Sequence, residues 1–171
     1  MPALTRLRAA RPDEAGLLDG WRRSPASPYE DWAGDPPPGL ACVGGGALPV
    51  PAGAGELVVT DAGDRPLGTV TWRTVAYGPA PGSSALDVGI SLRPHARGRG
   101  HGGRAQRLLA DYLFATTGVH RVQATTDVAN LAEQGALRRA GFTAEGVLRS
   151  AQWRAGRYHD LQCWSRLRSD A

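Results

Sequence analysis

The sequence predicts a single mixed α+β domain with helices on both faces of one sheet. Its 171 residues are enough for one domain with a substantial core. Stretches in which apolar and polar residues alternate are interspersed with stretches of helical periodicity. The chain has no internal repeat and no regular succession of parallel βαβ units, so it favours neither a repeat protein nor a doubly wound parallel fold.

The N-terminal part predicts a strand followed by a helix. Residues 4–10 favour a first strand. Pro12-Asp13-Glu14 is typical of a helix start, because proline fits the first helical position and acidic residues there interact favourably with the helix dipole. We expect this helix to direct Ala15, Leu18 and Trp21 toward the core.

The next two segments are less regular. In residues 23–34, Tyr29 and Trp32 indicate a short second helix. Residues 35–55 are rich in glycine and proline and too long for a routine connection. Two interpretations of this loop stay open, a flexible insertion and a lid over an acceptor site.

The middle of the chain predicts three strands. Residues 56–60 and 66–75 favour two of them, and a turn at 77–83 leads into a central strand at 85–92. Apolar residues alternate along this central strand, namely Leu86, Val88, Ile90 and Leu92. Pro94 ends it, because proline has no N–H to donate to a neighbouring strand.

A helix follows, and its apolar residues recur at helical spacing from Ala105 to Gly118, a typical stop signal. The expected buried face consists of Ala105, Leu108, Leu109, Tyr112 and Leu113.

The C-terminal part predicts a strand, a short helix and a hairpin. The strand covers 120–126, and the helix covers 130–140 and is closed by Gly141. Residues 143–153 and 157–167 favour two strands that turn about Ala155-Gly156.

Composition narrows the possible partners. The net charge is +4, and all 20 basic residues are arginine, which supports anionic ligands without requiring nucleic acid. Two cysteines, Cys42 and Cys163, are too few for a disulfide scaffold, and no metal-binding pair lies near either. We therefore expect a cytoplasmic protein that binds no metal. The N-terminus lacks the apolar core of a signal peptide, and no apolar run is long enough to span a membrane.

The loop before the long helix has the features of an anion site. Four glycines in Arg97-Gly98-Arg99-Gly100-His101-Gly102-Gly103 let the backbone turn sharply and approach a ligand closely. The free N–H groups and the dipole at a helix N-terminus favour an anion, and nearby arginines add positive charge. The spacing matches neither a P-loop nor a Rossmann fingerprint. We expect the rings of His95 and His101 to face phosphate groups or solvent.

The spacing Arg97-x-x-Gly100-x-Gly102 resembles the pyrophosphate-binding loop [RQ]-x-x-G-x-[GA] of the GNAT superfamily of N-acetyltransferases. Asn130, Gly141-Phe142 and Glu145-Gly146 resemble the signature of its RimJ/RimL-like branch. The resemblance is strong over residues 84–167 and looser before them. It implies the GNAT fold, with a mostly antiparallel twisted sheet of about six to seven strands and helices on both faces.

The resemblance also implies acetyl-CoA as cosubstrate. The pyrophosphate would be bound at Arg97 and at the backbone N–H groups of Gly98, Arg99, Gly100, His101, Gly102 and Gly103. Gly89 would mark a bulge that frees the backbone of Ile90, Ser91 and Leu92 toward the pantetheine and thioester, unless it is a glycine against which a neighbour packs closely. Asn130 would bind the pantetheine arm, cap the following helix, or do both.

The candidates for proton transfer are Asp87, Glu133 and Glu145, with His120 and His159 as further possible bases. Many RimJ/RimL-like members have serine where this chain has Glu133, and other branches have tyrosine where it has Leu137. Asn130-x-x-Glu133 also resembles a capping box. As a proton donor, Glu133 would need a raised pKa.

The resemblance implies an N-acetyltransferase that moves an acetyl group from acetyl-CoA to a primary amine by direct attack in a ternary complex. The amine could be a protein N-terminus or a small molecule, and the protein could be a monomer or a homodimer. The alternatives are a non-catalytic acyl-CoA-binding module and an enzyme that uses a longer acyl-CoA. A nucleic-acid binder is disfavoured because no aromatic platform is interleaved with the arginines.

Overall fold

The computed structural model describes residues 4–24, 27–30 and 53–170, which form one seven-stranded sheet in the order β1-β2-β3-β4-β5-β7-β6. The strands are β1 (Arg6–Arg8), β2 (Gly55–Thr60), β3 (Pro66–Ala76), β4 (Ser84–Leu92), β5 (Arg121–Asp127), β6 (Thr143–Arg154) and β7 (Arg157–Leu167). All neighbouring strands in this sheet are antiparallel except β4 and β5. The mixed α+β prediction with a mostly antiparallel sheet is confirmed.

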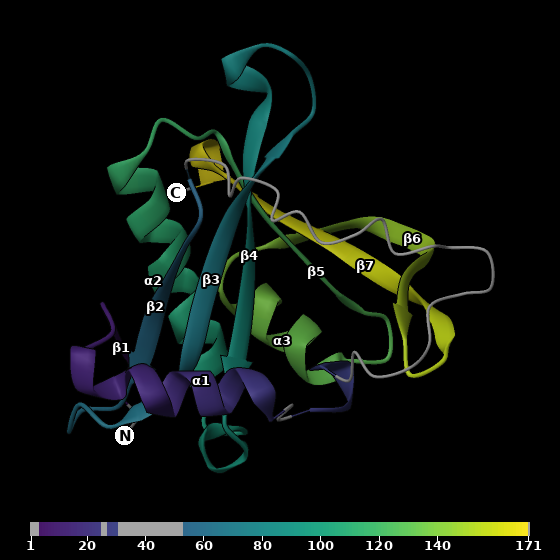
Figure 1. The fold of residues 1–171 in the computed structure, drawn as a ribbon. Helices are drawn as coiled ribbons and strands as arrows, with labels where there is room; N and C mark the ends of the chain where they lie inside the picture. Colours follow the sequence, from purple (N-terminus) through teal and green to yellow (C-terminus); the bar gives the residue numbers. More distant parts are fainter. Residues whose placement is uncertain (1–3, 25–26, 31–52, 171) are drawn as a thin grey trace, which may run out of the picture.

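Helices cover both faces of the sheet, as expected. In Figure 1, α1 (Ala15–Arg23) lies in front of it, and α2 (His101–Thr116) and α3 (Leu131–Arg139) lie behind it. The main core lies between the sheet and α2 and α3, and its fully buried members include Leu109, Leu113, Leu137, Val122 and Trp164. Within the described stretches, no helix combines the length and apolar character needed to cross a membrane.

The N-terminal helix buries a different residue from the one expected. Leu18 is buried as predicted and Trp21 is partly buried, but Ala15 is exposed. Glu14 takes the inward position instead, because the Arg8 guanidinium donates two hydrogen bonds to its carboxylate, at 2.6 and 2.7 Å. The inward stripe is thus Glu14, Leu18 and Trp21, at helical spacing.

The buried face of α2 is also rotated from the expected one. Leu108 and Tyr112 are 40% and 44% exposed, whereas Gln106 and Ala110 are buried beside Ala105, Leu109 and Leu113. The helix begins at His101, four residues before the apolar pattern starts. Because α3 packs against α2 in addition to the sheet, the buried face is wider than the apolar stripe and includes a glutamine.

The segment between α1 and β2 is described only in part. A 3-10 turn at Pro28–Glu30 contains Tyr29, whose hydroxyl donates to the Ala129 carbonyl. Trp32 and residues 35–52 lie outside the described residues, so the second helix and the two interpretations of the loop stay predictions. The strand after the loop begins at Gly55.

The C-terminal hairpin forms as predicted. Ala155 and Gly156 both have positive φ (48° and 74°), as a two-residue turn of this type requires. Two irregularities interrupt the pairing of β6, which is an edge strand. Glu145 is an extra residue between Ala144 and Gly146, and the second irregularity lies between Leu148 and Gln152.

Candidate functional site

The sheet opens between its two parallel strands. The pairing of β4 with β5 covers three positions and ends at Asp87 and Gln123. Beyond that point β4 continues to Leu92 and β5 to Asp127, and Figure 1 shows the two strands diverging. Within the described part of the chain, the backbone of β4 that follows Asp87 therefore has no strand partner on its β5 side and can bond a ligand.

This opening does not arise from a bulge at Gly89, so that prediction is wrong. The pairing of β3 with β4 is unbroken from Gly68 opposite Leu92 to Ala76 opposite Ser84. A Cβ at Gly89 would lie 3.0 Å from the Thr71 hydroxyl oxygen. The glycine thus accommodates a close neighbour, and the free backbone groups result from the divergence of β4 and β5.

The N-terminus of α2 has the predicted anion-binding geometry. Gly98 and Gly100 have φ values of 70° and 80°, which favour glycine, and Gly100 is the N-cap residue. The first hydrogen bond of the helix runs from Arg104 N to Gly100 O at 3.4 Å. The amides before Arg104, at His101, Gly102 and Gly103, therefore have no acceptor within the helix and can bind an anion.

A second glycine requirement sets the distance between α2 and α3. A Cβ at Gly103 would lie 3.1 Å from the Ala136 carbonyl oxygen and 3.4 Å from Arg139 Cβ. Only glycine lets the first turn of α2 approach α3 this closely without a shift. The anion site therefore packs closely against the C-terminal half of α3.

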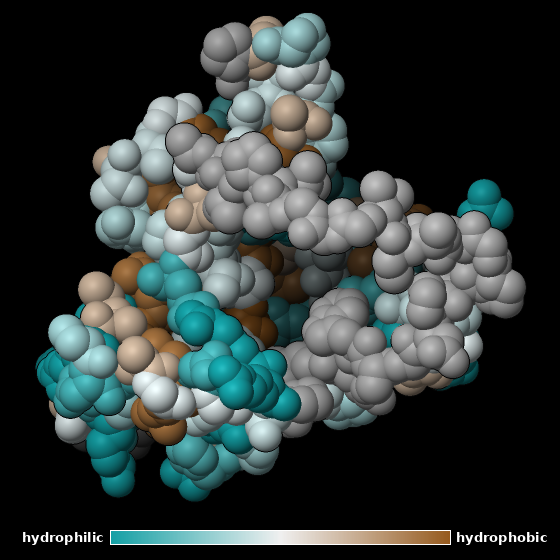
Figure 2. Space-filling view, in the orientation of Figure 1, coloured by the Kyte–Doolittle hydropathy of each residue, from teal (hydrophilic) through white to brown (hydrophobic). Residues whose placement is uncertain are grey.

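One cleft of about 770 Å³ joins the opening of the sheet to this helix N-terminus. Its lining includes nine of the predicted site residues, Ile90, Leu92, Arg97, Gly98, Gly100, Gly102, Gly103, Asn130 and Glu133. Ser91, Arg99 and His101 do not line it. In Figure 2, the molecule is hollowed in its middle, with apolar brown atoms visible at depth.

The side chains of His101 and Arg97 are held by the protein. The His101 ring is 5% exposed and lies 2.9 Å from the Thr5 hydroxyl, so the expectation that it faces phosphate or solvent is wrong. Burial, followed by the charge of Arg104, lowers its pKa and favours the neutral ring. Arg97 Nε donates to the Leu92 carbonyl at 2.8 Å, which ties the loop to the end of β4.

Asn130 and Glu133 lie together at the start of α3. Asn130 Oδ1 accepts the Glu133 amide at 3.2 Å, so the N-cap prediction is confirmed. The Glu133 side chain extends into the cleft lining, where it hydrogen-bonds to Gln106 of α2. Burial raises its pKa to about 7.

Gln106 was not identified from the sequence. It is 2% exposed, and its Nε2 also lies 3.4 Å from the Gly102 carbonyl. The available signal was its spacing, because Gly102, Gln106, Leu109 and Leu113 follow one helical stripe. A glutamine within such a stripe indicates a buried polar partner.

The other two predicted carboxylates lie elsewhere. Asp87 forms an ion pair with Arg73 at 3.0 Å and lines neither this cleft nor the smaller pocket described next. Glu145 forms a bidentate ion pair with Arg121 and accepts from the Ser165 hydroxyl at 2.7 Å. These contacts, led by the one to Arg121, lower its pKa to about 2. The three predicted catalytic residues therefore do not converge.

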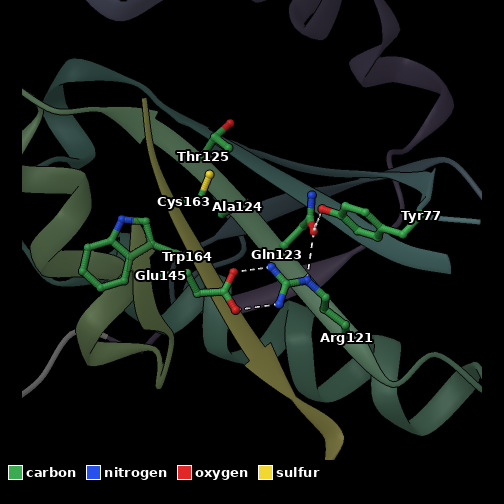
Figure 3. A pocket seen from close by; sticks show the side chains of 8 residues that line it. All are labelled: Tyr77, Arg121, Gln123, Ala124, Thr125, Glu145, Cys163 and Trp164. Carbon is green, nitrogen blue, oxygen red and sulfur yellow. Dashed lines mark hydrogen bonds and ion pairs between the residues drawn. The ribbon is translucent and has the colours of Figure 1, made fainter. Parts of the chain in front are cut away.

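Glu145 lines a separate pocket of about 420 Å³ (Figure 3). There the Tyr77 hydroxyl donates to Gln123 at 2.6 Å, and Arg121 Nε donates to the same amide oxygen at 3.0 Å. Figure 3 shows these side chains joined in one chain that ends at Glu145. The pocket shares Ala124 and Thr125 with the main cleft, so the two adjoin.

A buried ionic cluster at the far end of the cleft also escaped prediction. Asp127 and Arg154 form an ion pair, each with 4% of its side chain exposed. His159 Nδ1 lies 3.0 Å from the same carboxylate, and its Nε2 lies 3.2 Å from the Arg154 carbonyl. Both ring nitrogens are engaged, so His159 is not available as a base here. His120, the other predicted base, is exposed.

The comparisons with known proteins agree with this geometry. The family model for the acetyltransferase (GNAT) domain matches residues 47–143, more than half of the chain. The probable N-acetyltransferase YjcK of Bacillus subtilis (strain 168) is 30% identical over 113 residues, which are 66% of this chain and 61% of the relative. The chain thus matches about three fifths of that relative's length.

Solved structures show the same architecture. Ribosomal-protein-S5-alanine acetyltransferase from Vibrio fischeri has a TM-score of 0.61 and 27% identity over 68% of this chain and 63% of that one. Spermidine N-acetyltransferase from Vibrio cholerae, solved with CoA and spermine, has a TM-score of 0.70 over 97% and 96% of the chains, and at 19% identity it supports the fold alone. Taken with the family match, these findings establish that the chain belongs to the GNAT acetyltransferase family.

Proposed function

We propose that this protein transfers an acetyl group from acetyl-CoA to a primary amine by direct attack in a ternary complex. The observation that carries the proposal is the single cleft that connects an anion-binding helix N-terminus with unpaired backbone of β4. The diphosphate of acetyl-CoA would bind the amides of His101, Gly102 and Gly103. The pantetheine would extend between β4 and β5, where its amides can pair with free strand groups.

The proposed acceptor is a primary amine, and two kinds of primary amine are candidates. The RimJ/RimL-like signature and the likeness to an S5-alanine acetyltransferase favour a protein N-terminus. A small-molecule amine is the second candidate. The far end of the cleft, near Tyr29, Gln152 and Arg154, is where the acceptor would enter, because the anion site occupies the opposite end.

The amine reacts as the free base and loses its second proton to water. Glu145 is a poor base because its pKa is lowered to about 2, and Asp87 is ion-paired with Arg73 and does not line the cleft. Holding the amine against the thioester carbonyl supplies most of the acceleration in such a mechanism. In this proposal, backbone N–H groups of β4 that follow Asp87 polarise that carbonyl, which the end of the pairing with β5 supports.

The test is calorimetric titration with acetyl-CoA, followed by a thiol-release screen over amines and N-terminal peptides. The variant Gly100→Trp forces a bulky side chain onto a residue with φ of 80° at the helix N-terminus and should abolish binding. The matched control is Gly118→Trp at the other end of α2, where a Cβ meets nothing within 4 Å. It should bind like wild type.

Each outcome has a definite meaning. Binding by wild type and by the Gly118 variant but not by the Gly100 variant supports the cofactor site. Binding without thiol release from any amine would support a non-catalytic acyl-CoA module. Stronger binding of a longer acyl-CoA than of acetyl-CoA would indicate that the longer acyl-CoA is the donor. No binding by wild type at millimolar acetyl-CoA would overturn the proposal.

A further inference from the structure

The cofactor cleft contains one carboxyl group, that of Glu133, with no counter-ion among the residues that the structure describes. Glu133 lies in the first turn of α3, one turn before Ala136, which packs against Gly103 of the anion site. It also lies one turn after the N-cap residue Asn130, next to the end of β5. Its side chain lines the cleft that joins the anion site to the diverging strands.

The polar neighbour of this carboxyl group is neutral. Gln106 of α2 donates to it, and Gln106 is itself buried in the contact between α2 and α3. The charged side chains that line the same cleft are Arg97, Asp127, Arg139 and Arg154. Asp127 and Arg154 neutralise each other, and among the described residues no charged group shifts the ionisation of Glu133.

We propose that Glu133 is the general acid that protonates the CoA sulfur as it leaves. This inference rests on the proposed function. The amine nitrogen forms a bond to the carbonyl carbon, and the C–S bond then breaks, with its electron pair remaining on sulfur. The carboxylic acid of Glu133 gives its proton to that sulfur, and the amide nitrogen releases one proton to water. Water returns a proton to the carboxylate, so the reaction is balanced.

The ionisation of the group suits this role. With a pKa of about 7, a useful fraction of Glu133 is protonated at neutral pH. A thiol with a pKa of about 8.5 holds a proton more tightly, so transfer to the thiolate is favourable. Bound acetyl-CoA fills the cleft that Glu133 lines and removes water from the carboxyl group, which raises its pKa further, so the group is protonated before the chemical step.

This linkage gives a test that needs no turnover. At pH 8, acetyl-CoA has no thiol to titrate, and its phosphate monoester, with a second pKa of about 6, is already ionised. Titrations in two buffers with different ionisation enthalpies then report proton uptake by the protein. We expect wild type to take up about half a proton or more per acetyl-CoA, and Glu133→Gln to bind with almost none.

Kinetics provide the second readout. Wild type should lose kcat as Glu133 ionises at high pH, whereas Glu133→Gln should have a kcat about 100-fold lower and without that alkaline limb. Gln106→Leu removes a hydrogen bond that lowers the pKa of Glu133, so the alkaline limb should move to higher pH. A structural role for either residue would lower stability without moving the limb.

Failure of this inference can be told apart from failure of the proposed function. If acetyl-CoA does not bind wild type, the proposed function is wrong. If it binds and wild type takes up no proton at pH 8, or the kcat of Glu133→Gln stays within threefold of wild type with the alkaline limb in place, Glu133 is not the acid. The absence of proton uptake by wild type would overturn the inference even where the variant folds poorly.

Discussion

Two glutamates in one domain have opposite surroundings. Glu133 lines the main cleft, has no counter-ion among the described residues, and has a pKa that burial raises to about 7. Glu145 lies at a bulge of β6, bound by Arg121 and Ser165, and its pKa is lowered to about 2. An ion pair fixes a charge in place, whereas burial beside a neutral donor leaves a proton able to move. The comparison thus separates a group suited to chemistry from one suited to holding strands together.

The largest expected effect is on catalysis. Glu133→Gln should lower kcat by about 100-fold or more, because a neutral amide cannot donate the proton. Glu145→Gln, the matched change on β6, should lower it less than about 10-fold, because Glu145 is ionised throughout the working range. Steady-state thiol release measures both. Equal losses of kcat in the two variants would contradict the assignment of a catalytic role to Glu133 alone.

The second largest expected effect is on the pH dependence of stability, which should differ between wild type and Glu133→Gln. Because the pKa of Glu133 is higher in the folded protein than its ordinary value of 4.5, its contribution to stability is present below pH 4.5 and lost as pH rises through about 7. At pH 8, Glu133→Gln should be more stable than wild type by roughly 2–3 kcal/mol, and at pH 4 the two should agree. Urea denaturation at both pH values measures this. A constant difference across pH would contradict it.

The close contact between α2 and α3 should contribute both to stability and to the raised pKa of Glu133. Gly103→Ala places a Cβ 3.1 Å from the Ala136 carbonyl and should destabilise the fold by about 1–2 kcal/mol. Water admitted between the helices should also lower the pKa of Glu133, which shifts the alkaline limb of kcat to lower pH. Gly135→Ala is the control, because its Cβ meets only the flexible end of Arg139, and it should stabilise α3 by about 0.5–1 kcal/mol. Thermal unfolding of Gly103→Ala and Gly135→Ala measures the two changes in stability.

The smallest effect concerns Arg121. Glu145 is 39% exposed, so the loss of its partner in Arg121→Gln should reduce stability at pH 7 by at most about 1 kcal/mol. The pKa of Glu145 is lowered in the folded state, so its contribution is present above pH 4.5 and lost as pH falls toward 2. Acid unfolding of the variant should therefore begin at higher pH. A loss of stability several times larger would mean that Arg121 and Glu145 behave as a buried ion pair.

Local patterns in the sequence predicted the elements and the anion site, because each depends on neighbouring residues. The alternation in β4, the turn at Ala155-Gly156 and the glycines before α2 all correspond to the structure. The failures concern packing between distant segments. Ala15 is exposed because Arg8 draws Glu14 inward, and the face of α2 is rotated because α3 covers Gln106.

The candidate site shows the same division. The sequence identified Glu133 but left capping and catalysis as alternatives, and the structure assigns the cap to Asn130. The raised pKa of Glu133 depends on burial between two helices, which no local pattern reports. The cluster of Asp127, Arg154 and His159 joins residues far apart in the chain and had no signal in their spacing.

The irregular pairing of β6 has a consequence for solubility. An edge strand with a long, regular row of free backbone groups can recruit the edge of another molecule. Here the extra residue Glu145 and the break between Leu148 and Gln152 divide the outer edge into short segments, and the opposite edge, β1, has three residues. Both edges of the described sheet therefore disfavour its continuous growth from one copy to the next, although Val147 and Leu148 are exposed on β6.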